Sequence, residues 1–290
     1  MKPESVSGSS LTGHRITWLK GTTGMAVLIL AAVLLCSILA PWLAPYDPNQ
    51  VNMTERLAPL SAHHLLGTDT LGRDVFSRLL YGGRVSIVLA IAVTAVTMLL
   101  GLVIGTLSGY WGGWADDVIQ AVVSMFQGLP GLAFMLAIAG TLGPGTKSLF
   151  IALIVTSWPD FSRVVRGEVM KLREEAYVEG IRSLGAGHTY IIVRHLLPNM
   201  IGPLVVLGTI RVGRVILSIA SLSFLGLGLQ PPAPDWGVMV NDARAHFRSY
   251  PHLMLAPGLC IGVVSLCINW IGDHLRDQLD KKSSPDKSLL

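Results

Sequence analysis

Residues 85–115 decide the fold class: they read VSIVLAIAVTAVTMLLGLVIGTLSGYWGGWA and contain no Asp, Glu, Lys or Arg. A helix needs about 20 mostly apolar residues to cross the hydrocarbon core of a bilayer. This run is long enough for one crossing, and similar runs lie on both sides of it. The pattern predicts an all-α membrane protein.

Six stretches of the chain can each hold one transmembrane helix. They are residues 21–46, 85–115, 118–146, 148–163, 199–229 and 249–272. The fourth stretch is the shortest, because charged residues follow Trp158-Pro159-Asp160. The fifth stretch counts as one span although it contains Arg211 and Arg214.

The composition excludes several function classes. Hydrophobic residues make up 51% of the 290 residues and charged residues 14%, whereas soluble domains carry about 25% charged residues. A soluble fold this poor in charge would expose large apolar patches. The basic residues lie between the apolar runs rather than in one stripe, which argues against nucleic-acid binding. A water-soluble enzyme and a disordered chain are excluded on the same grounds.

Lys and Arg in the connections predict the orientation, because cytoplasmic loops carry an excess of both. The two tails and the segment 163–198 hold 13 of them, and the connections on the other side hold seven. Both termini are therefore expected in the cytoplasm. The predicted organisation is a cytoplasmic tail (1–21), a first transmembrane helix (22–44), an external loop (45–83), a transmembrane core (84–274) and a cytoplasmic tail (275–290).

Glycine and proline mark special positions within the spans. Gly101, Gly105 and Gly109 share one helix face, as do Gly258 and Gly262, and small residues let helices approach closely. Packing within one bundle or a dimer interface would both explain this spacing. Pro130 follows Gln127 in the third span and removes a backbone donor, which predicts a kink there. Freed backbone groups at membrane depth need protein or a water-filled path to satisfy them.

Arg211 and Arg214 are the most informative charges, because an arginine inside a membrane nearly always faces the bundle interior or a cavity. Their spacing of three places them on one helix face. They could pair with an acid such as Asp160, or extend toward one membrane surface. Alternatively, they line a route for an anionic solute, with Asp160 and Gln127 as further candidates for the substrate path.

The segment 163–198 is expected on the cytoplasmic face as a helix–turn–helix. Helix-forming residues run from Glu168 to Leu184, and Gly185-Ala186-Gly187 then breaks the helix. A second apolar and basic stretch reaches Pro198. A free-standing channel has no need of such a protrusion, whereas a transporter driven by another protein does.

This segment resembles the EAA loop of bacterial ABC-importer permeases. Glu179, Gly185, Leu197 and Pro198 stand at matching places, while Gly180, Ile181 and His195 depart from the pattern. Other stretches resemble the permeases of the dipeptide, oligopeptide and nickel subfamily. They are residues 64–69, 71–78, 222–228, 230–232, 235–237 and parts of 269–280. The resemblance thus extends over nearly the whole chain.

The resemblance implies a type I ABC-importer permease with six transmembrane helices in the bacterial inner membrane. Such permeases pair with a second, related permease and two cytoplasmic ATPase subunits, and an external solute-binding protein delivers the cargo. A coupling helix is expected near Ala176–Leu184 within an EAA-like loop at 174–198. The residues implied in ATPase coupling are Ala176, Tyr177, Glu179, Gly180, Ser183, Leu184, Gly185, Ala186 and Pro198.

No ATP, cofactor or metal site is expected in the chain itself. Residues 140–148 resemble a phosphate-binding loop, but Thr146 separates the glycine from the lysine that such a loop requires. ATP and Mg²⁺ are therefore expected on the partner subunits. None of the eight histidines falls deep in a predicted span, which argues against a buried metal site even if nickel is the cargo.

Two other function classes remain as alternatives. A self-contained secondary transporter or channel predicts activity from this chain alone and acids at mid-span, where only Asp160 comes close. An integral-membrane enzyme would need clustered catalytic side chains, which the sequence lacks. The subfamily carries peptides, glutathione-like thiols, nickel and metal–chelator complexes, and the two intramembrane arginines favour a cargo with carboxylates.

Overall fold

The computed structural model describes residues 21–283 of the 290-residue chain. Within these residues every regular element is a helix, and the one β-bridge, between Thr68 and Asp74, is isolated. The predicted all-α class is confirmed. Most of the predicted tail 1–21 and the end of the predicted tail 275–290 lie outside the described residues.

The helices follow one another with short connections, except for the long segment before α3. Their bounds are α1 Thr22–Ile38, α2 Ala40–Leu43, α3 Val75–Trp111, α4 Gly113–Gln127, α5 Gly131–Leu142, α6 Thr146–Arg173, α7 Ala176–Ser183, α8 His188–Ile191, α9 Leu197–Phe224, α10 Trp236–Ala243 and α11 His252–Ser283. A π-helical stretch, Ile192–Leu196, joins α8 to α9, and 3₁₀ turns cover Met53–Glu55 and Arg244–His246.

Four helical stretches among the described residues are long and apolar enough to cross a membrane. They are α3, α6, the continuous helical stretch His188–Phe224 that ends with α9, and α11 up to Leu279. The pair α4 and α5, bent by 87°, adds a fifth if it counts as one span. Helix α1 is apolar but only 17 residues long, and α2 extends it after a break at Leu39. Six crossings therefore stay a prediction.

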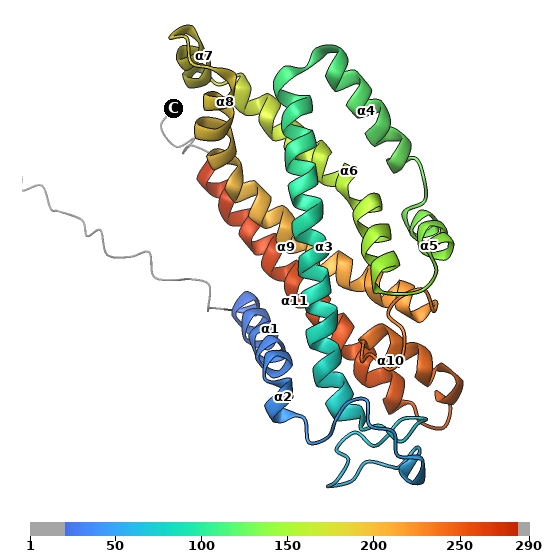
Figure 1. Cartoon of the computed structure of the whole chain (residues 1–290). Coiled ribbons are helices and arrows are strands. Elements are labelled where there is room, and N and C mark those ends of the chain that lie inside the picture. Colours follow the sequence, from blue (N-terminus) through green and yellow to red (C-terminus); the bar gives the residue numbers. More distant parts are fainter. Residues whose placement is uncertain (1–20, 284–290) are drawn as a thin grey trace, which may run out of the picture.

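Helix α3 runs the length of the molecule, with α1 and α2 on one side and α4 and α5 on the other (Figure 1). The segment 44–74 and α10 lie at one end of the bundle, and α7 lies at the opposite end (Figure 1). The two segments that the sequence assigns to opposite sides of a membrane are thus separated by the full length of α3.

Three glycines of α3 bring its backbone against α6. A β-carbon at Gly105 would lie 2.5 Å from the Ser162 carbonyl oxygen, and one at Gly109 would lie 2.8 Å from the Arg166 carbonyl oxygen. Gly101 is packed on Phe161 in the same way. The predicted close packing within the bundle is confirmed for this face. At Gly258 and Gly262 a β-carbon would meet no described atom within 4 Å.

Helix α6 is longer than the fourth span predicted from the sequence. It continues for ten residues beyond Arg163 and includes Pro159. The charged side chains that end the apolar run do not end the helix, and one of them, the Arg166 guanidinium, forms a two-pronged ion pair with the Asp116 carboxylate of α4. Hydropathy marks the limit of a membrane span, whereas backbone hydrogen bonding decides where a helix stops.

The continuous helix predicted over Glu168–Leu184 is wrong. Helix α6 ends at Arg173, and α7 begins at Ala176 after the pair Glu174 and Glu175. Negative charge is unfavourable at the carboxyl end of a helix and favourable at its amino end. The two glutamates therefore suit a position between the helices better than one inside a single helix.

Two predicted segment boundaries also fall inside helices. Helix α3 begins at Val75, because Asp74 accepts a hydrogen bond from the Ser77 N–H at 2.7 Å and caps the helix. Residues 75–83 of the predicted external loop are thus the first turns of α3. Helix α11 continues from the predicted core into residues 275–283.

We predict that Gly105→Ala destabilises the bundle, because the new methyl group would push α3 away from the α6 backbone. Overpacking of this kind costs about 1–3 kcal/mol. The expected result is a lower melting temperature of the purified chain in detergent. Gly258→Ala, where a β-carbon finds open space, is the matched control and should melt like the wild type. Equal melting temperatures for both variants would contradict the close packing.

Candidate translocation path and coupling segment

Three of the four residues predicted for the substrate path meet in one polar cluster between α4, α6 and α9, in which the Asp160 side chain is 49% exposed. Arg211 Nη2 of α9 lies 2.6 Å from Asp160 Oδ2 of α6. Gln127 Nε2 of α4 donates to Asp160 Oδ1 at 2.9 Å. The Asp160 carboxylate thus joins three helices through a charge and two hydrogen bonds.

The cluster lies at the break between α4 and α5. Gln127 is the last residue of α4, and Pro130 precedes the first residue of α5. The kink predicted at Pro130 is confirmed as a break with a bend of 87°. The hydrogen bond from Gln127 to Asp160 connects the end of α4 to α6 at the point where the helix is interrupted.

Arg211 has the acid partner that one of the two sequence-based alternatives required. Its Nη2 atom also donates to the Ser157 carbonyl oxygen at 3.1 Å, and its guanidinium lies 5.3 Å from the centre of the Phe161 ring. Sequence reasoning missed Ser157 and Phe161 because a carbonyl oxygen and an aromatic ring carry no signal in an apolar run. Arg214 lies one turn further along α9, and its side chain is exposed.

A cavity of about 340 Å³ lies between α6, α9 and α11. Val164 and Glu168 line it from α6, at four-residue spacing from Asp160. Pro203, Leu207 and Ile210 line it from α9, on the helix face that continues to Arg214. On α6 the lining residues follow Asp160 toward α7, and on α9 they precede Arg211 and are therefore also nearer to α7, so the cavity lies on that side of the cluster (Figure 1).

Helix α7 presents two different faces. Val178 is fully buried in an apolar cluster with Val169 and Ile191, and Ile181 packs against that cluster. The opposite face is open, and the Leu184 side chain beyond its end is 88% exposed. An apolar side chain exposed this fully at the end of a helix is typical of a surface that a partner covers.

The glycine predicted to end this helix does so by a defined hydrogen-bond pattern. Gly185 has a φ of +85°, its N–H donates to the Arg182 carbonyl oxygen, and the Ala186 N–H donates to the Ile181 carbonyl oxygen. This pair of bonds is the Schellman motif, in which the residue after the helix adopts a left-handed conformation that favours glycine.

The structure brings most of the predicted coupling residues onto one exposed surface at α7. The exposed ones are Ala176, Tyr177, Glu179, Gly180, Ser183, Leu184 and Gly185, whereas Ala186 is half-buried. Pro198 is exposed in the first turn of α9, beside Asn199, whose side chain donates to the Tyr177 hydroxyl at 3.2 Å. Their role in coupling stays a prediction.

Two contacts at this end were not predicted. The Tyr110 hydroxyl of α3 lies 2.9 Å from His188 Nδ1 of α8, and Arg173 donates to the Tyr110 carbonyl oxygen at 3.1 Å. They fasten the segment that carries α7 to the last turn of α3. Residues nearly 80 positions apart give no sequence signal for such a contact.

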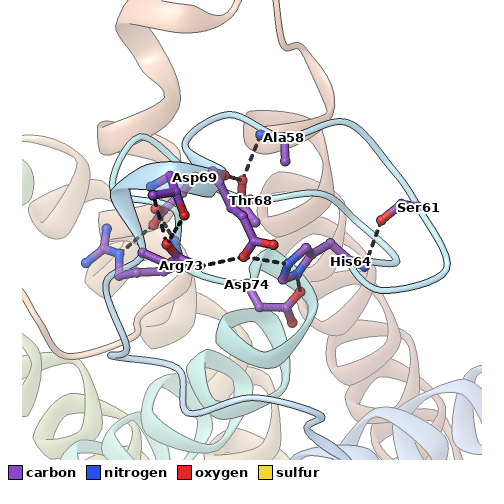
Figure 2. Close-up of polar contacts among 10 residues, drawn as sticks. Ala58, Ser61, His64, Thr68, Asp69, Arg73 and Asp74 are labelled. Atoms are coloured by element: carbon purple, nitrogen blue, oxygen red, sulfur yellow. Dashed lines mark hydrogen bonds and ion pairs between the residues drawn. The ribbon is translucent and has the colours of Figure 1, made fainter.

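At the opposite end, a histidine connects the segment 44–74 to the first turn of α3. His64 is buried, its Nδ1 lies 2.9 Å from Asp74 Oδ1, and its Nε2 lies 3.4 Å from Glu55 Oε2. Figure 2 shows the His64 ring pointing at the Asp74 carboxylate that caps α3. Burial alone would lower the pKa of His64, but the hydrogen bonds and charges of Asp74 and Glu55 outweigh it, so this pKa lies above 6.5.

Buried arginines hold the rest of this end together. Arg73 Nε lies 2.6 Å from Asp69 Oδ2, and its Nη2 lies 3.3 Å from Asp242 Oδ2 of α10. Arg78 donates to the Pro48 carbonyl oxygen at 3.0 Å. The Asp69–Arg73 pair is drawn in Figure 2. The segment 44–74, α3 and α10 therefore form one hydrogen-bonded unit.

Apolar helices long enough to span a membrane, a charged pair between two of them, a cavity toward one end and an exposed helix at that end are features expected of a membrane-embedded transport protein. Residues 101–282 match the family described as binding-protein-dependent transport system inner membrane component. Residues 23–59 match the N-terminal TM domain of oligopeptide transport permease C. The chain belongs to the first of these families, the permease subunits of ABC importers.

Similar proteins agree with this assignment. The glutathione transport system permease protein GsiD of Pectobacterium atrosepticum is 41% identical over 261 residues, which cover 89% of this chain and 85% of that protein. The nickel transport system permease protein NikC of Escherichia coli K12 is 40% identical over 256 residues, which cover 88% of this chain and 92% of that protein. The fold resembles a chain of the MetNI methionine ABC transporter in an inward-facing conformation. That match has a TM-score of 0.52 and 19% identity, and covers 70% of this chain and 96% of the other.

We predict that the segment 44–74 is held more firmly at about pH 6 than at about pH 8. A histidine whose pKa is raised by folding contributes its full stabilisation below its unfolded pKa of about 6.5 and loses it as pH rises through the folded value. Hydrogen–deuterium exchange of this segment, corrected for intrinsic rates at each pH, measures the effect.

His64→Gln should abolish the difference between the two pH values. The neighbouring His63 is exposed, so His63→Gln is the matched control and should preserve the difference. Equal protection of the wild type at both pH values would contradict the role of His64.

Proposed function

We propose that this chain forms half of the translocation path of an ATP-driven importer and is moved through α7. In this proposal α1 with α2, α3, the α4–α5 pair, α6, α9 and α11 make six crossings of the bacterial inner membrane. The segment 44–74 and α10 face outward, and both termini are cytoplasmic. The excess of Lys and Arg around α7 supports this orientation.

The observation that carries the proposal is the position of α7 between two membrane-spanning helices. It follows α6 after two residues and is joined to α9 through α8 and the π-helical stretch. Its inner face is buried and its outer face is open. A force on such a helix passes directly into both spans. Coupling requires an element of this kind that has different contacts in two states.

The partners follow from the class of transporter. A second permease subunit completes the path, two cytoplasmic ATPase subunits dock on α7 and supply the energy, and an external solute-binding protein delivers the cargo to the outward face. ATP and Mg²⁺ bind to the ATPase subunits, and this chain has no enzymatic activity of its own. The exposed Leu184 side chain supports docking of a partner at α7.

The proposed cargo is a small solute with free carboxylates, such as a short peptide, or a metal ion held by an anionic chelator. The polar cluster and its neighbour Arg214 contain one acid and two arginines, namely Asp160, Arg211 and Arg214, so the local charge there is positive. The resemblance to glutathione and nickel permeases supports the same range of cargo.

We predict that Gly185→Val uncouples ATP hydrolysis from transport in the complete transporter. Valine at a φ of +85° is strained by roughly 1–2 kcal/mol, which corresponds to about 5–30-fold in the docking equilibrium. Uptake per ATP hydrolysed should fall by that factor. Gly187 has an ordinary φ of −69°, and both glycines have open space around them, so Gly187→Val is the matched control.

Charge reversal by Glu179→Lys should have a similar effect, because Glu179 lies on the exposed face of α7. The measurement compares solute uptake with ATPase activity in proteoliposomes. Wild-type coupling in both Gly185→Val and Glu179→Lys would refute the role of α7, and transport by the purified chain alone would refute the proposal as a whole.

A further inference from the structure

The two arginines of the candidate path have different surroundings. Arg211 is satisfied within the chain, because Asp160, the Ser157 carbonyl oxygen and the Phe161 ring surround it and its side chain is only 12% exposed. The same Asp160 carboxylate accepts the hydrogen bond from Gln127 at the α4–α5 break. This arrangement is that of a structural ion pair, which fixes the position of three helices.

Arg214 has the opposite surroundings. Its side chain is exposed, and among the described residues no acid lies within ion-pair distance of it, although its charge interacts with Asp160 at longer range. A charged side chain at membrane depth is too costly to face lipid, so it faces water, a solute or an acid, or extends to the membrane surface. It shares an α9 face with Leu207 and Ile210, which line the 340 Å³ cavity, but Arg214 itself lies one turn beyond Arg211, on the far side of the polar cluster from that cavity.

We infer that Arg214, and not Arg211, binds the carboxylate of the cargo as it crosses the membrane, and that Gln127, Asp160 and Arg211 are positioning residues. The inference rests on the proposed function and assigns a specificity-determining residue within it. A guanidinium offers a carboxylate two parallel hydrogen bonds. A bare metal cation is repelled at this point, so a metal would have to pass as an anionic complex.

The first test does not depend on the identity of the cargo. Arg214→Cys is made in a chain whose Cys36, Cys260 and Cys267 are replaced by alanine, and the complete transporter is treated with a charged, membrane-impermeant thiol reagent. Arg214→Cys should react more than about tenfold faster than Leu28→Cys, an exposed position on the peripheral helix α1. An unreactive Arg214→Cys would overturn the inference, because the position would then not face water.

The second test measures transport with labelled glutathione and with Ni²⁺ in excess citrate, an anionic complex, as probes. Arg214→Gln should lower uptake of a carried probe by about tenfold or more, and Arg214→Lys should restore part of it. Lys147→Gln, which removes an exposed cation at the far end of α6, is the control and should transport normally. Wild-type uptake by Arg214→Gln would overturn the inference.

Two further readouts separate contact with the cargo from a structural role. Arg211→Gln and Asp160→Asn should each lower the melting temperature of the transporter, and their double variant should be no worse than the worse single one. Arg214→Gln should leave the melting temperature and copurification with the second permease unchanged. Loss of copurification would mean that Arg214 pairs with an acid of that permease, against the inference.

Different outcomes would contradict the proposed function rather than the inference about Arg214. A wild-type complex that hydrolyses ATP but carries neither probe would contradict the proposed cargo, while the cysteine test would still decide whether Arg214 faces the path. A wild-type complex that assembles with no ATPase subunit would contradict the proposed function itself, whatever Arg214 does.

Discussion

The close contact between α3 and α6 is the constraint on which the remaining structure depends. Lipid offers no hydrophobic force to hold two helices together, so their distance is set by packing. Gly101, Gly105 and Gly109 remove the side chains that would separate the two backbones. Since α6 carries Asp160 at mid-length and leads into α7, both candidate sites are positioned by this one contact.

Polar side chains have different structural roles near the ends of the bundle and within the spans. Near the ends, the ion pairs Arg73–Asp242 and Arg166–Asp116 connect different elements of the fold. Within the spans, the pair Arg211–Asp160 lies beside the break between α4 and α5, to which Asp160 is joined through Gln127. A break in a helix exposes backbone groups, and polar neighbours are what a membrane protein needs there.

The fold class, the kink at Pro130 and the end of α7 at Gly185 could be predicted from the sequence, because hydropathy, proline and glycine act locally. The meeting of Gln127, Asp160 and Arg211 could be suspected only from their charge and polarity, since the three lie on separate helices. The contacts of Tyr110 with His188 and of His64 with Asp74 could not be predicted, because they depend on tertiary packing. The end of α6 at Arg173 was missed because both flanking segments favour helix.

The uninterrupted length of α3 has a consequence for communication between the two faces of the membrane. Its 37 residues span about 55 Å, well beyond the roughly 30 Å of the hydrocarbon core. One histidine contacts each end of this rod: His64 through the capping carboxylate of Asp74, and His188 through the Tyr110 hydroxyl. A rigid tilt of α3 about its middle would move these two contacts in opposite directions, so both would change together if the helix tilted.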